Sequence, residues 1–149
     1  MLIILSSLLT VGAHNFNIAY QWETRPTIEI CPETNVTIEE VSQALGYWNS
    51  KDIGLQIHSI KKVNYCSLEK ENTIQITNGD LIEVSNEIAN TAISWYYYDN
   101  APNQKFIDYT SVRIPTDLEN YPRIDIITHE LGHALGLDHS NHEIMKPKF

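Results

Sequence analysis

Residues 129–139 read HELGHALGLDH, and the spacing of the three histidines in this stretch constrains the fold around it. On an α-helix, residues four apart are separated by about 40° around the axis and about 6 Å along it, so the rings of His129 and His133 can converge on one ion. His139 can reach the same ion only if the chain leaves the helix after His133. Gly136 permits that exit, because glycine adopts the left-handed conformation that commonly ends a helix.

Three histidines brought together in this way are typical of a catalytic zinc site. Zinc suits neutral imidazole, and a catalytic site uses three protein ligands while a fourth position stays open for water. Glu130, next to the first ligand, is placed to receive a proton from that water and to pass it to the leaving amine. From average residue usage, a chance match to the full spacing in a chain of this length is on the order of one in 10⁵. We therefore expect one zinc ion at His129, His133 and His139, with Glu130 as the catalytic base.

The longer stretch HELGHALGLDHS resembles the extended zinc signature of the metzincin peptidases, and its last residue, Ser140, resembles the matrixin branch. The resemblance implies a zinc endopeptidase that hydrolyses peptide bonds in extended protein substrates. It also implies a methionine below the metal, for which Met145 is the match, although ordinary core packing is the alternative for this residue. No stretch resembles the matrixin segment that binds structural zinc and calcium, so we expect a single zinc ion and no calcium.

The resemblance extends more weakly over most of residues 24–147. In matrixins, the strand that corresponds to residues 91–98 is a sheet edge that pairs with the substrate. Trp95, Tyr96 and Tyr97 could then contact substrate side chains, although core packing is the alternative for at least half of them. The sequence ends four residues after Met145, so we expect an abbreviated C-terminal part.

Periodicity and turn residues predict the other elements. The capping box of Thr37 and Glu40 predicts the start of a helix whose apolar stripe runs to Trp48. A second helix is predicted from Ile124 onward, and residues 99–104 are expected to form a loop. Strands are predicted at residues 27–30, 55–60, 73–77, 91–98 and 106–114, of which the second and third alternate as half-buried strands do. This order indicates an α+β fold with helices packed on one face of a sheet. The resemblance implies a zincin-like twisted mixed sheet with the early helix and the zinc-site helix on that face.

Cys31 and Cys66 are the only cysteines in the sequence. An even number of cysteines in an exported chain favours a disulfide. Such a bridge would close a loop of about 35 residues and add about 3 to 4 kcal/mol by the chain-entropy estimate. Two buried thiols, or one thiolate bound to the metal, are the alternatives.

Residues 1–13, MLIILSSLLTVGA, form a short apolar run followed by the small residues of a signal-peptide cleavage site. A buried N-terminal strand or a different start codon is the alternative, because no basic residue precedes the run. The run is too short to span a bilayer, so we expect a secreted protein without stable membrane insertion. We expect residues 14–149 to form a single matrixin-like zinc peptidase domain, and that domain to be a monomer. The net charge of -9 argues against nucleic-acid partners.

Two functions therefore compete. The first is a secreted endopeptidase acting on proteins or peptides, with an open zinc position. The second is a non-catalytic, zinc-stabilised binding domain in which Cys31, Cys66, His14 or His142 supplies a fourth ligand. The presence of Glu130 favours the endopeptidase, because a purely structural site has no use for a carboxylate beside the metal.

Overall fold

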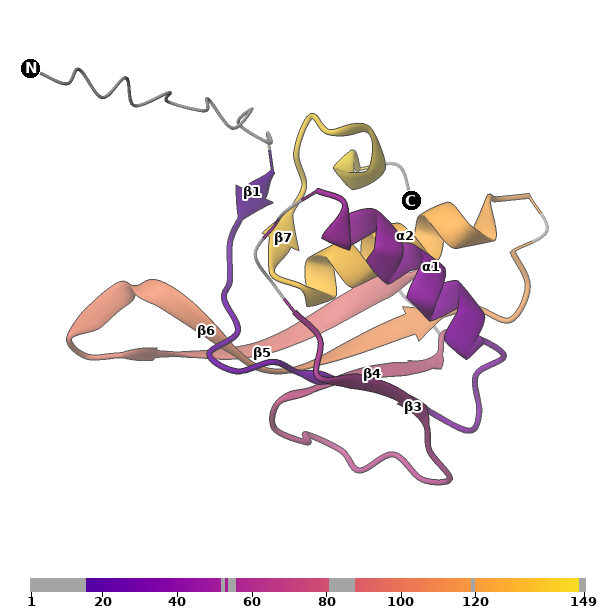
Figure 1. Cartoon of the computed structure of the whole chain (residues 1–149), viewed down its shortest axis with the longest axis horizontal. Helices are drawn as coiled ribbons and strands as arrows, with labels where there is room; N and C mark the ends of the chain where they lie inside the picture. Colours follow the sequence, from indigo (N-terminus) through magenta and orange to yellow (C-terminus); the bar gives the residue numbers. More distant parts are fainter. Residues whose placement is uncertain (1–15, 52, 54–55, 81–87, 119, 148–149) are drawn as a thin grey trace, which may run out of the picture.

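The computed structural model of the protein describes residues 16–51, 53, 56–80, 88–118 and 120–147 (Figure 1). The predicted signal peptide, residues 1–13, lies outside these residues. Along the chain the elements are β1 (Asn17–Ile18), β2 (Thr27–Ile30), α1 (Ile38–Asn49), β3 (Ser59–Lys62), β4 (Thr73–Asn78), β5 (Asn90–Tyr98), β6 (Ala101–Ile114), α2 (Arg123–Ala134), β7 (Leu137–Asp138) and the 3₁₀ helix η1 (Glu143–Met145). Neither of the two α-helices in this part of the chain is long and apolar enough to cross a membrane.

In the part of the chain that the structure describes, the main sheet has five strands in the order β3-β2-β4-β6-β5. The first four strands in this order are parallel, and β5 runs antiparallel to β6 at the edge. α1 and α2 lie together over one face of the sheet, and β1 pairs with β7 beside the end of α2 (Figure 1). The fold is thus α+β with a zincin-like mixed sheet, and the prediction of the fold class is confirmed.

α1 begins at the predicted capping box. The Thr37 side chain accepts a hydrogen bond from the Glu40 backbone N–H at 3.2 Å, and the Glu40 carboxylate accepts one from the Thr37 N–H at 2.9 Å. Near the other end of the helix, Trp48 is 1% exposed and donates its indole N–H to the Thr128 carbonyl of α2 at 2.8 Å. This contact fixes α2, which carries the histidines, against α1.

The core lies between the sheet and the two helices. Aliphatic side chains from β2, β4 and α2 fill it, and burying each of them stabilises the fold by about 1.5–3 kcal/mol. The fully buried members from these three elements are Ile28, Ile30, Ile74, Ile76, Ile126, Ile127 and Leu131.

β4 is buried on both faces, so the prediction that it is half-buried is wrong. On the face away from the helices, Gln75 is 6% exposed and donates to the Ser67 carbonyl at 2.5 Å. Next to it in β2, Glu29 is 2% exposed and lies 2.5 Å from the Lys70 ammonium and 3.2 Å from that of Lys61. The segment between β3 and β4 therefore covers polar side chains that would otherwise face water.

This covering segment is joined to β2 by a disulfide. Cys31 directly follows β2, and its sulfur is bonded to that of Cys66 with the two Cα atoms 5.6 Å apart. In the structure, then, neither cysteine is a free thiol.

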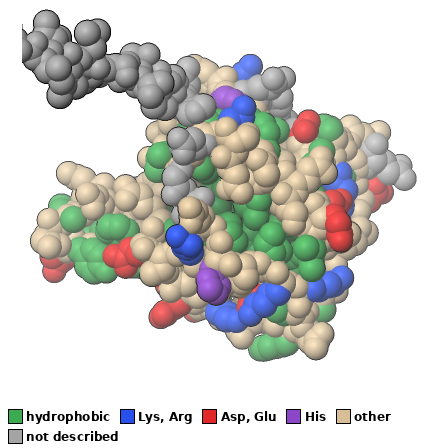
Figure 2. All heavy atoms as spheres, in the orientation of Figure 1, with side chains coloured by type: hydrophobic (Ala, Val, Ile, Leu, Met, Phe, Trp, Pro, Cys, Tyr) green, Lys and Arg blue, Asp and Glu red, His purple; other side chains and the backbone are tan. Residues whose placement is uncertain are grey.

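β3 forms the edge of the sheet opposite to β5. Lys61 and Lys62 are exposed on this strand, and Figure 2 shows Lys and Arg side chains gathered in this part of the surface. Charged side chains on an edge strand oppose pairing with another chain.

Two predicted boundaries are wrong. The strand predicted at residues 55–60 is observed as Ser59–Lys62, where parallel pairing sets Ser59 opposite Thr27, and residue 55 lies outside the described residues. Residues 101–104, predicted as part of a loop, belong to β6, which begins at Ala101. The pair Tyr96 and Phe106 extends the β5–β6 hairpin, with ring centroids 5.8 Å apart. Cross-strand aromatic packing of this kind stabilises strands that local polarity disfavours.

Candidate metal centre

α2 supplies two of the three histidines. His129 and His133 lie one turn apart on this helix, where His129 is 2% exposed and His133 is half-buried. The helix ends at Ala134, so the chain leaves it just after His133, as the spacing of the motif requires.

Gly136 forms the turn that returns the chain to the site. Its φ of +101° lies in the region that favours glycine. A Cβ atom at this position would lie 2.2 Å from the Tyr20 carbonyl oxygen. The Gly136 carbonyl also accepts hydrogen bonds from the backbone N–H groups of Ala19 at 2.9 Å and Tyr20 at 3.1 Å. The segment around β1 therefore holds the turn from outside, and β7 then leads to His139.

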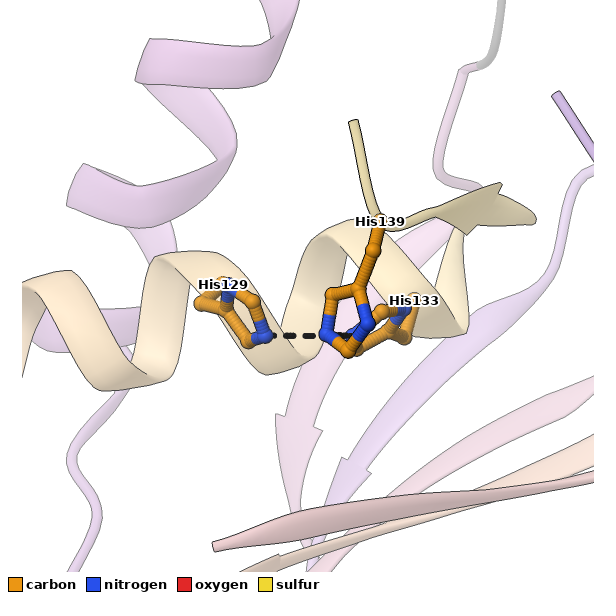
Figure 3. Close-up of side chains that lie close together, drawn as sticks. All are labelled: His129, His133 and His139. Atoms are coloured by element: carbon orange, nitrogen blue, oxygen red, sulfur yellow. Dashed lines mark hydrogen bonds between the residues drawn. The ribbon is translucent and has the colours of Figure 1, made fainter. Parts of the chain in front are cut away.

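The three rings converge (Figure 3). The His133 Nε2 atom lies 3.1 Å from His129 Nε2 and 3.3 Å from His139 Nε2. One donor atom from each ring can be chosen so that all three lie within 4.8 Å of one another. The structure thus brings together the three residues that the sequence predicted as metal ligands.

The other ring nitrogens fix the tautomers. His129 Nδ1 lies 2.6 Å from the Ile144 carbonyl oxygen, and His133 Nδ1 lies 2.8 Å from that of Leu137. A carbonyl oxygen only accepts hydrogen bonds, so each Nδ1 carries the proton. In the neutral rings the two Nε2 atoms then turn lone pairs toward the same point, an arrangement that a cation stabilises.

The spacing of these nitrogens suits zinc. Nitrogens at about 2.0–2.1 Å from a tetrahedral zinc ion lie about 3.3–3.4 Å apart, close to the two short separations observed. Burial lowers the pKa of His133. The Leu137 carbonyl and the Asp138 charge oppose this effect, and the neighbouring His139 adds to it. The ring is therefore held neutral, the state in which imidazole binds a metal.

A pocket of about 280 Å³ opens beside the histidines. Glu130 lines it and is 3% exposed. The Thr91 hydroxyl, from the start of β5, lies 2.7 Å from Glu130 Oε2 and 3.0 Å from the Glu130 carbonyl oxygen. The remaining lining residues are Tyr20, Ala89, Asn90, Ile93, Leu137 and Asp138.

Met145 lies against α2, where the resemblance placed a methionine. It is fully buried, and a Cβ atom at Gly132 would lie 2.6 Å from its sulfur and 2.6 Å from the Trp48 ring. Gly132, within the motif, therefore leaves the space that the methionine occupies. The adjacent Ile144 supplies the carbonyl that orients His129, so η1 both fills this space and fixes a ring.

The three aromatic residues of β5 divide between the two faces of the strand. Trp95 and Tyr97 are 41% and 53% exposed, and their ring centroids lie 6.4 Å apart. The Tyr96 hydroxyl instead donates to the Glu23 carboxylate at 2.6 Å, and this hydrogen bond raises the pKa of the phenol. Trp95 also contacts Tyr20, a pocket residue, with centroids 6.1 Å apart. Trp95 and Tyr97 thus form an aromatic surface that extends from the pocket along β5, whereas Tyr96 is not part of it.

The structure places three of the four proposed fourth ligands away from the histidines. Cys31 and Cys66 are bonded to each other. The His142 ring packs on Phe16, with centroids 4.5 Å apart, and does not join the histidine cluster. His14 lies outside the described residues.

Sequence reasoning missed Thr91, Tyr20 and the two carbonyls that orient the rings. Backbone carbonyls carry no residue signal. Thr91 and Tyr20 reach the site only through the pairing of distant segments, so no local spacing reveals them.

A comparison with curated proteins found no match. Residues 8–144 match the model of the family described as dual-action HEIGH metallo-peptidase. The HELGH of residues 129–133 differs from the five letters of that description only at Leu131. The match supports a zincin-like metallopeptidase in general and not a matrixin in particular. With the histidine cluster and the motif in place, the chain belongs to the dual-action HEIGH metallo-peptidase family and is a metallopeptidase, a hydrolase of peptide bonds.

Proposed function

We propose that the protein is a secreted endopeptidase that cleaves extended polypeptides at a single zinc ion held by His129, His133 and His139. The observation that carries this proposal is the convergence of the three rings beside a pocket that Glu130 also lines. Glu130 is the general base, and no calcium ion takes part.

Glu130 and the backbone carbonyls around the histidines have separate roles in the proposed reaction. When bound, zinc supplies a Lewis acid that polarises the scissile carbonyl and lowers the pKa of the attacking water. Glu130 accepts the proton that the water loses and donates it to the leaving amine. The carbonyls of Ile144 and Leu137 hold two of the rings in one tautomer and one orientation, the role that outer hydrogen bonds have in metal sites.

β5 is the proposed substrate edge, in the manner of the matrixins. Among the described residues it is the edge strand of the sheet and runs antiparallel to β6, so its outer edge can pair with an extended peptide. Thr91 and Ile93 lie at the pocket. Trp95 and Tyr97, exposed beyond it, would contact substrate side chains farther from the scissile bond. Tyr96, bound to Glu23, would not.

Export and the monomeric state remain part of this proposal. The disulfide of Cys31 and Cys66 supports export, because such bridges persist in oxidising compartments. The bonded cysteines also weigh against a closed, purely structural metal site that uses a thiolate.

The test compares the cleavage of an unstructured protein by wild type and by Glu130→Gln. We expect wild-type cleavage to stop on addition of a chelator and to return with zinc, and Glu130→Gln to bind zinc with little activity. Equal, chelator-insensitive rates for the two proteins would refute the proposal. Tight zinc binding without any cleavage would favour the zinc-stabilised binding domain.

A further inference from the structure

We infer that Thr91 is a positioning residue for Glu130. This inference rests on the proposed function, because it assigns a role to a neighbour of the proposed general base. The Thr91 hydroxyl is 2.7 Å from Glu130 Oε2, a distance typical of a strong O–H···O hydrogen bond. The Thr91 hydroxyl contacts Glu130 at both its carboxylate and its carbonyl oxygen, so Thr91 acts through Glu130.

The geometry restricts the carboxylate from two sides. Glu130 is attached to α2, whereas Thr91 belongs to β5, so the contact joins the helix to the edge strand of the pocket. Because the Thr91 hydroxyl occupies Oε2, rotation of the carboxylate about its last bond is restrained. A carboxylate already held in one orientation loses less conformational entropy when it aligns with the attacking water.

The Thr91 hydroxyl can hydrogen-bond to the Glu130 carboxyl group whether that group is ionised or protonated. An ionised carboxylate accepts the Thr91 hydrogen. A protonated carboxyl that carries its proton on the other oxygen still presents Oε2 as an acceptor, so the hydrogen bond from Thr91 persists. Thr91 therefore remains a hydrogen-bond partner of the general base before and after proton transfer.

A matched control exists in the same sheet. Thr110 in β6 is fully buried, and its hydroxyl has no hydrogen-bond partner among the described residues. Thr91→Val and Thr110→Val remove the same hydroxyl at similar shape, but only the first removes the contact with Glu130. Thr91→Ser retains a hydroxyl at the same position.

The first test is steady-state kinetics on one peptide substrate, with zinc content measured for each protein. We expect Thr91→Val to lower kcat about tenfold to a hundredfold with KM and zinc content unchanged, since it removes a hydrogen bond to a charged group. Thr91→Ser should restore kcat to within a few-fold of wild type, and Thr110→Val should leave it unchanged. The inference would be overturned if Thr91→Val had the same kcat as Thr110→Val, or if its kcat fell only in proportion to its zinc content.

The second test does not depend on activity. Crystal structures of metal-free Thr91→Val and Thr110→Val should show the Glu130 carboxylate displaced or in several orientations only in Thr91→Val. An unchanged, single orientation in both variants would overturn the inference. If wild type shows no peptidase activity, the proposed function fails, while this structural comparison still decides whether Thr91 orients Glu130.

Discussion

Replacing Gly136 by alanine tests the turn that carries His139 to the metal. A residue with a Cβ atom at a φ of +101° incurs about 1–2 kcal/mol of backbone strain. The new Cβ would also lie 2.2 Å from the Tyr20 carbonyl oxygen, and overpacking of this kind costs about 1–3 kcal/mol. We therefore expect Gly136→Ala to lower the free energy of unfolding by about 2–5 kcal/mol.

Gly46→Ala is the matched control for this prediction. Gly46 lies within α1, and a Cβ atom there would meet nothing within 4 Å. The control should raise the free energy of unfolding by about 0.5–1 kcal/mol, because alanine is the better helix former. Urea denaturation of metal-free proteins with the disulfide intact, followed by circular dichroism, measures both changes. Equal shifts for the two variants would refute the proposed role of the turn.

Three further predictions follow from the disulfide, the buried carboxylate and the aromatic strand. Replacing both Cys31 and Cys66 by serine should lower the free energy of unfolding by about 3–4 kcal/mol, and an unchanged urea midpoint would contradict this. Burial would raise the pKa of Glu29, but the two lysines that contact it outweigh burial and hold the pKa below the ordinary value of 4.5. The ionised Glu29 carboxylate therefore stabilises the fold above pH 4.5, and this effect is lost as the pH falls through the lower folded-state pKa. Glu29→Gln should therefore weaken the fall in the free energy of unfolding at acid pH. An identical pH dependence in wild type and variant would exclude this effect. Trp95→Ala should raise KM for an extended protein about threefold to thirtyfold, while the exposed Tyr65→Ala should not, and equal KM values would count against the substrate edge.

The parts of the fold that depend on local chemistry could be predicted from the sequence. The capping box of Thr37 and Glu40 uses contacts within one helical turn, and it set the start of α1 correctly. The histidine spacing likewise depends on one helix and one glycine turn, so the convergence of the three rings can be predicted from the sequence.

The parts that depend on distant segments could not be predicted in this way. The start of β6 is set by the pairing of Ala101 with Tyr98, which extends the strand across the proline and the two polar residues at 102–104. The second buried face of β4 exists because a disulfide-bonded segment folds across it, which alternation within β4 cannot show. The contact between Thr91 and Glu130 joins residues 39 positions apart and likewise has no local signature.

A crystal structure of the zinc-loaded protein, with the metal located by anomalous scattering, tests the central claim most directly. The account predicts one ion about 2.0–2.1 Å from Nε2 of His129, His133 and His139, with a solvent oxygen in the fourth position beside Glu130. A fourth ligand from the protein, or an ion bound away from these rings, would contradict it.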